Sequence, residues 1–239
     1  MVNKIENIDL NIFNLERGAR ILDLGSGMGY LSRRLSAYGW EIIALDREVK
    51  LLSSLKNIVN NTKWTFPMHI VAADAKGLPF KDSFFDGIIM TEVLEHIENP
   101  KEALSECYRI LKTNGMFCLS VPSSYTEKFY GLLHPKYFDN AGHINIFKKH
   151  SLCDLLKKSR FKVCGIRKEN FEPALFWIVH SFLRSKFDFT GVPKENFTAT
   201  KIFNACFNFL DYAKFKQPLM NIGRKILYKS LYIYCRKPY

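Results

Sequence analysis

A glycine-rich turn and two aspartates, each at the end of a predicted strand, could together bind a small ligand. The turn, DLGSGMG (residues 23–29), lies between a short β-branched run and a helical pattern. Glycines there let the backbone bend sharply and approach a ligand that Cβ atoms would block. Asp46 and Asp74 follow the next two predicted strands. An acid at the first position can accept bonds from both ribose hydroxyls, and one at the second from an exocyclic amine such as that of adenine.

Each of these features also has a plain structural interpretation. A glycine turn after a strand is commonly just a tight turn, and a single Asp at a strand end is as often a helix cap. The dinucleotide fingerprint G-x-G-x-x-G would need glycine at position 30, where the chain has Tyr30, which argues against an NAD-dependent dehydrogenase. Acids at three successive strand ends, one of them in a glycine loop, favour ligand binding.

Strand and helix patterns alternate between residues 20 and 122. Strands are predicted over residues 21–24, 41–45, 69–72, 85–90 and 116–121, and helices over residues 30–38, 48–59 and 100–111. A helix over 151–159 and strands over 161–167 and 229–236 follow. Strict alternation implies right-handed crossovers and a mostly parallel, doubly wound α/β sheet.

Two segments depart from this alternation. Residues 123–150 are rich in Tyr, His and Gly and are predicted to form a long loop or lid. Residues 171–228 are predicted to be a helical, aromatic insertion, because the chain from residue 171 onward holds 16 of its 34 aromatic residues. We therefore expect one domain built from residues 1–170 and 229–239. The insertion would be a cap on the core, a lid that contacts substrate, or a membrane contact.

The composition limits where in the cell the protein is expected and which classes of partner it would bind. The 239 residues carry a net charge of +12, which would attract nucleic acid, anionic lipid or an acidic substrate, although a solvated basic surface explains it equally well. The six cysteines form no C-x-x-C pair, which favours reduced thiols over disulfides or zinc. No secretory signal and no apolar stretch of roughly 18 residues is found. These features predict a cytoplasmic protein.

The motifs resemble those of class I S-adenosylmethionine-dependent methyltransferases. ILDLGSGMG resembles their motif I, an acid followed by G-x-G-x-G, and Asp46 in IIALDRE matches the acid that holds the ribose. The stretch from residue 72 to residue 100 and the segment RILKTNGMFCLSVP are also similar. The resemblance covers residues 20–122 well, is weaker over 142–169 and is absent over 171–228. It implies a Rossmann-like sheet with an antiparallel last strand, and S-adenosylmethionine as the cofactor.

The resemblance also implies roles for the methionine end of that cofactor. Asp23 and the backbone of Gly25, Ser26 and Gly27 would hold the methionine portion. Thr91, just past the fourth strand, would lie close to the same end.

The adenosine end has its own implied contacts. Asp46 would bind the ribose, and Arg47 could cover one face of the adenine. Asp74 and the Ala75 backbone would contact the adenine amine.

The reaction itself demands few residues. Methyl transfer from a sulfonium is an in-line displacement with a good leaving group, which alignment and the exclusion of water accelerate. His143, in a loop that could close over the site, is the candidate for a base or a substrate contact. The alternative is a surface histidine without a role.

A metal site is a further alternative. Glu92, Glu95 and His96 lie within one turn and could ligate a hard divalent cation. Quinone O-methyltransferases carry a similar E-x-x-E-H run, for which metal use has been proposed. More often such a histidine packs against or caps a short helix, so no metal ligand is assigned.

These observations predict a methyltransferase that acts on a small-molecule or lipid-like acceptor, with peripheral contact to an anionic membrane as an accompanying hypothesis. An RNA or protein methyltransferase, favoured by the charge, and a non-catalytic S-adenosylmethionine-binding regulator are the alternatives. TEVL (residues 91–94) stands where methyltransferases of base amino groups carry an N-P-P-Y-like tetrapeptide, which argues against amino-group methylation of bases and makes nucleic acid the less favoured partner. The sequence does not name the acceptor.

Overall fold

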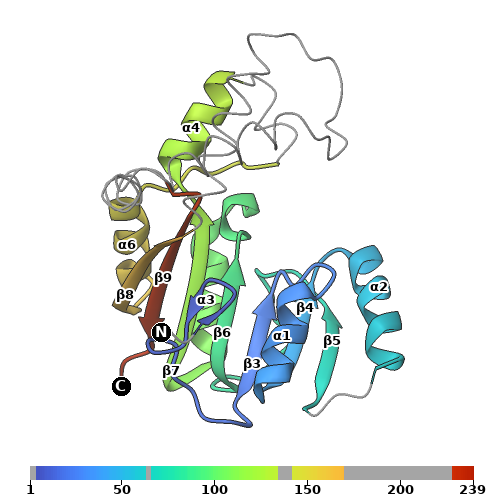
Figure 1. Ribbon diagram of the computed structural model, residues 1–239. Coiled ribbons are helices and arrows are strands. Elements are labelled where there is room, and N and C mark those ends of the chain that lie inside the picture. Colours follow the sequence, from blue (N-terminus) through green and yellow to red (C-terminus); the bar gives the residue numbers. More distant parts are fainter. Residues whose placement is uncertain (1–3, 63–65, 134–141, 170–227) are drawn as a thin grey trace, which may run out of the picture.

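The computed structural model describes residues 4–62, 66–133, 142–169 and 228–239. Within these residues the main sheet has the strand order β5-β4-β3-β6-β7-β9-β8 (Figure 1). Its strands are β3 (Arg20–Leu24), β4 (Glu41–Asp46), β5 (Met68–Ala72), β6 (Phe85–Thr91), β7 (Leu111–Pro122), β8 (Lys162–Glu169) and β9 (Ser230–Arg236). Of these strands, β9 alone runs in the direction opposite to the other six. The predicted doubly wound sheet with an antiparallel last strand is confirmed.

Both faces of the sheet are buried. Along β4, Ile43 and Leu45 belong to one apolar cluster, whereas Ile42 and Ala44 belong to the other. A strand covered on both faces reads as a continuous apolar run rather than an alternating one, which explains the sequence of β4. The described helices are α1 (Tyr30–Tyr38), α2 (Val49–Asn60), the 3₁₀ turn η1 (Leu94–His96), α3 (Pro100–Ile110), α4 (Ser124–Leu133) and α6 (Lys149–Lys158).

An N-terminal hairpin, which the sequence did not predict, closes one face of the sheet. It consists of β1 (Lys4–Ile5) and β2 (Ile8–Asp9). Asp9 is buried, its backbone N–H donates to the Tyr234 hydroxyl at 2.8 Å, and its carboxylate accepts from Arg167 Nε at 2.9 Å. These contacts join the start of the chain to β8 and β9.

The prediction of a long loop over residues 123–150 was wrong in its first part. Residues Ser124–Leu133 form α4, which stands beyond the ends of β7 and β9 in Figure 1. Thr126 Oγ1 donates to the Tyr228 carbonyl at 2.8 Å, so a contact with a distant segment holds the helix. The S-x-x-E spacing of Ser124 and Glu127 is a helix-start signal that the composition of this segment obscured.

The predicted insertion at residues 171–228 lies, except for Tyr228, outside the described residues. In the part of the chain that is described, no helix combines the length and apolarity needed to cross a bilayer. The cysteines within the same part are unpaired, and they are Cys107, Cys118, Cys153, Cys164 and Cys235.

Candidate functional site

The site lies where the strand order reverses. From β3 the chain moves through β4 to β5 on one side, and β6 then returns to pair with the other side of β3. Ligands of open α/β sheets bind at the carboxyl ends of the strands at such a switch point. A cavity of about 530 Å³ opens there, a size in the range of small-molecule sites. The lining residues include Gly25, Asp46, Arg47, Asp74, Ala75, Glu92, Val93, His96 and Ile144.

The glycine loop after β3 is packed so closely at Gly25 that a side chain would not fit there. Gly25 has φ 79° and donates its N–H to the Leu45 carbonyl at 2.7 Å. A Cβ at this position would lie 2.2 Å from Val93 Cγ2. The neighbouring Ser26 Oγ is buried and has no hydrogen-bond partner within the described chain, which suits a loop that receives a polar ligand group.

Replacing Gly25 by alanine is expected to lower the free energy of unfolding by more than the roughly 1–2 kcal/mol that a left-handed backbone alone costs, because the Val93 side chain must also move. Gly27→Ala is the matched control, since Gly27 also has a positive φ but a Cβ there meets nothing within 4 Å. Urea denaturation of both variants measures the difference. Equal destabilisation would show that the contact with Val93 is unimportant.

Asp46 joins the glycine loop to the end of β4. Its Oδ2 accepts from the Gly27 N–H at 2.8 Å, and its Oδ1 accepts from the Glu48 N–H at 2.9 Å. The carboxylate faces the cavity with lone pairs left for a ligand hydroxyl. Arg47, next in the chain, also lines the cavity, and its Nε lies 4.0 Å from Glu48 Oε1.

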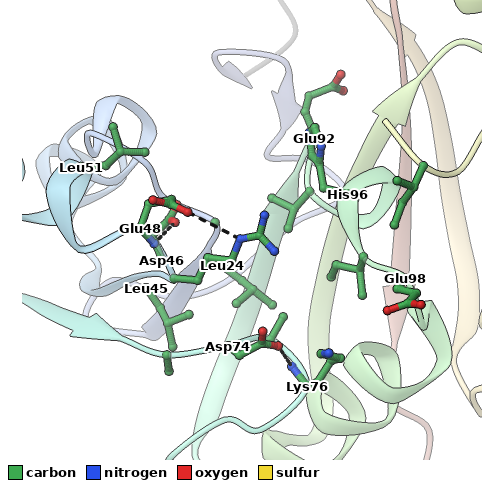
Figure 2. Close-up of a pocket in the computed structure, with 17 residues that line it drawn as sticks. Leu24, Leu45, Asp46, Glu48, Leu51, Asp74, Lys76, Glu92, His96 and Glu98 are labelled. Carbon is green, nitrogen blue, oxygen red and sulfur yellow. Dashed lines mark hydrogen bonds and ion pairs between the residues drawn. The ribbon is translucent and has the colours of Figure 1, made fainter. Parts of the chain in front are cut away.

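Asp74 faces the same cavity from beyond β5. Its Oδ1 accepts from the Lys76 N–H at 2.8 Å, which fixes the turn, and Ala75 lines the cavity beside it. Figure 2 shows Asp46 and Asp74 at neighbouring positions of the pocket, with His96 and Glu92 across from Asp46. The structure therefore brings together Asp46, Arg47, Asp74 and Ala75 around one cavity, and their roles in binding a cofactor stay predictions.

Four predicted cofactor residues are not among the described residues that line the cavity. Ser26 and Gly27 belong to the glycine loop, of which Gly25 lines the cavity. Thr91 ends β6 directly before the lining residue Glu92. Asp23 is buried and accepts a hydrogen bond from Ser32 Oγ at the start of α1. Burial raises the pKa of Asp23 from 3.8 to about 6. The ligand roles of these residues stay predictions.

A cluster of carboxylates and imidazoles lies at the end of the pocket next to β6. The His96 and His143 rings meet edge to face, with centroids 4.8 Å apart, and His143 Nδ1 pairs with the buried carboxylate of Glu127. The Glu95 carbonyl accepts the backbone N–H groups of Ile144 and the residue after it, both at 3.0 Å. His143 itself is not one of the described lining residues, but its neighbour Ile144 is.

The carboxylates of this cluster are in an unusual electrostatic environment. Glu95 is fully buried, and neither of its carboxylate oxygens has a hydrogen-bond partner among the described residues. Burial, followed by repulsion from Glu92 and Glu127, raises the pKa of Glu95 to about 9. Burial also raises the pKa of Glu127 to about 7. Sequence reasoning missed Glu127, because only the folding of α4 brings it to His143.

Rossmann-like sheets bind nucleoside cofactors with a glycine loop and strand-end acids at a switch point, and the cavity of this chain has the same arrangement. Residues 22–119, less than half of the chain, match the family described as a methyltransferase domain. Over these residues the chain is therefore similar to methyltransferases.

Two curated proteins are similar to the chain in sequence. The chain is 27% identical over 234 residues to the biotin biosynthesis bifunctional protein BioHC of Teredinibacter turnerae, an alignment that covers 92% of this chain and 40% of that protein. It is 33% identical over 104 residues to the ubiquinone/menaquinone biosynthesis C-methyltransferase UbiE of Pectobacterium atrosepticum, covering 42% of this chain and 41% of that one. The chain thus spans less than half the length of these two curated relatives.

A solved structure shares the fold. Phosphoethanolamine N-methyltransferase 2 of Haemonchus contortus, in complex with S-adenosyl-L-methionine, superposes with a TM-score of 0.62 at 18% identity. The superposition covers 96% of this chain and 51% of that one.

Proposed function

We propose that this protein transfers the methyl group of S-adenosylmethionine to a small, largely apolar acceptor that carries a nucleophilic oxygen or carbon. The observation that carries the proposal is that Asp46 and Asp74 line one cavity, with the Gly25 loop at its edge and His96 across from Asp46. Acids in this arrangement suit a ribose and an adenine amine.

The residues present fit this cofactor. Asp46 would bind the ribose hydroxyls, Arg47 would cover one adenine face, and Asp74 with the Ala75 backbone would hold the adenine amine. The buried Ser26 Oγ, which has no partner within the described chain, would receive a polar group at the methionine end. Bound there, the cofactor supplies an electrophilic methyl group.

The acceptor would enter on the side of β6. Val93, Ile97 and Ile144 line the cavity there, and Ile144 is 60% exposed. Apolar side chains that line this part of the pocket suit an apolar or lipid-like acceptor. The name of UbiE, a quinone-pathway methyltransferase, supports the same class. In this proposal His143 faces the acceptor. It acts on the acceptor directly as a base, or it acts through another group that contacts the acceptor.

The proposal is tested with a methyl-labelled donor and three acceptor pools: lipid-extract vesicles containing isoprenoid quinols and phenols, total RNA, and a protein extract. Label is expected in the organic phase, because apolar side chains line the acceptor side. Label in RNA or protein instead would support the alternatives that the charge of +12 favours. Binding of S-adenosylhomocysteine without label in any pool would support a regulatory protein. Vesicles with and without anionic lipid test the membrane hypothesis in the same experiment.

A further inference from the structure

We propose that Glu95, His96 and His143 form a binding site for one divalent transition-metal cation at the acceptor end of the pocket. One ligand atom from each residue lies within 4.8 Å of the others. Glu95 and His96 come from η1, whereas His143 comes from the segment before α6, so the fold assembles the group from two distant parts of the chain.

Glu95 provides an observation that the packing of the described residues does not explain. Its side chain is fully buried, and both carboxylate oxygens lack a partner in the described part of the chain. Buried carboxylates are ordinarily paired, hydrogen-bonded or bound to a metal, because burial removes their hydration. A cation between Glu95 and the two imidazoles would supply the missing partner.

Both histidines also have the outer partner that metal-bound imidazoles typically have. A ligating histidine usually donates its second ring N–H to a carboxylate or a backbone carbonyl, which fixes the tautomer and the ring orientation. His143 Nδ1 pairs with the Glu127 carboxylate, and His96 Nδ1 lies 2.9 Å from the Gly142 carbonyl oxygen. With the proton on Nδ1 in each ring, Nε2 becomes the ligand atom in both.

The ligand set differs from the one suggested by the E-x-x-E-H run. Glu92 is not a member of the group, and its Oε1 accepts from Ser120 Oγ at 2.9 Å. His143 takes its place, which gives two imidazole nitrogens and one carboxylate. This combination suits Zn²⁺, Mn²⁺ or Co²⁺ better than Mg²⁺, and three protein ligands leave coordination positions open. His96 lines the pocket, so the cation would lie next to the acceptor space.

One consequence rests on the proposed function. A cation at this site would bind an acceptor oxygen and lower the pKa of its hydroxyl, as metals do for bound water. The proton would leave to solvent, and the oxygen would form a bond to the methyl carbon. The carbon–sulfur bond would break with its electron pair passing to sulfur. The acceptor class would then be a phenol or another hydroxyl compound.

The test is titration of the full-length, tag-free, metal-stripped chain with CoCl₂, followed by visible d–d absorption, and with ZnCl₂ and MgCl₂ by calorimetry. One Co²⁺ or Zn²⁺ per chain is expected, with much weaker binding of Mg²⁺. Glu95→Gln and His143→Ala should lose more affinity than the roughly 10–100-fold that removal of an orienting partner costs, and Glu127→Gln should fall within that range. His69→Ala, which removes an exposed histidine paired with Glu41, should bind as the unchanged chain does.

Failure to bind Co²⁺ or Zn²⁺ would overturn the proposal, as would unchanged binding by a folded His143→Ala variant. Thermal melts identify variants that do not fold, and Glu127→Gln leaves all three ligands in place. Because metal binding is measured without cofactor or acceptor, it can succeed where methyl transfer fails. Such a result would separate the metal site from the proposed function.

Discussion

Asp46→Ala is expected to weaken the binding of S-adenosylhomocysteine by about 1.5–3 kcal/mol, which is roughly 10–150-fold in Kd. Charged hydrogen-bond acceptors are worth this much, and the cofactor ribose would lose its only carboxylate at the end of β4. The substitution also removes the acceptor of the Gly27 N–H and of the Glu48 N–H, so the glycine loop loses a contact that shapes it. The measurement is isothermal titration calorimetry with S-adenosylhomocysteine, the product that methyl transfer leaves behind.

Asp154→Ala is the matched control, because Asp154 is a half-exposed acid that pairs with His150 on α6, away from the pocket. Its affinity for S-adenosylhomocysteine should equal that of the unchanged chain. Asp46→Asn should lie between the two, since an amide keeps one acceptor oxygen. Unchanged affinity in a folded Asp46→Ala variant would refute the ribose assignment.

The sequence could place Gly25, Asp46 and Asp74 at one edge of the sheet because the signals are local, and their cofactor roles stay predictions. The glycine turn, Asp46 and Asp74 each stand directly after a strand, and parallel pairing brings successive strand ends to one edge of the sheet. Apolar runs bounded by turn residues were enough to place those strands within a residue or two. Gly39, which follows α1 with φ 115°, is a further local signal, because a glycine in the left-handed conformation commonly ends a helix.

The acceptor half could not be predicted in the same way, because it depends on contacts between distant segments. Glu127 meets His143 only because residues 124–133 form a helix anchored on the carbonyl of Tyr228. The chemistry of Glu95 follows from its complete burial, and a short run of mixed polarity such as VLEH does not reveal which of its residues are buried. The N-terminal hairpin was missed because a strand of two residues is too short to show a periodic pattern in the sequence.

Asp23→Asn is expected to change stability and cofactor affinity in opposite directions. Burial raises the pKa of Asp23 in the folded protein from 3.8 to about 6, so the folded state binds the proton more tightly than the unfolded chain does. The stability that this protonation provides is present below about pH 4 and is lost as the pH rises through 6. An asparagine does not ionise, yet it can still accept from Ser32 Oγ. At pH 8 the variant should therefore be more stable by about 1–3 kcal/mol, and at pH 4 the two proteins should be equal within error.

The same substitution decides whether Asp23 belongs to the site. If its carboxylate holds the ammonium group of the methionine portion, the loss of charge should weaken S-adenosylhomocysteine binding by about 1.5–3 kcal/mol at pH 8, while urea denaturation shows the gain in stability. A buried charge kept at the expense of stability is expected only where a ligand uses it. If Asp23→Asn gains stability and binds as tightly as before, Asp23 serves only to hold Ser32, and Asp46 and Asp74 remain as the acids that define the pocket.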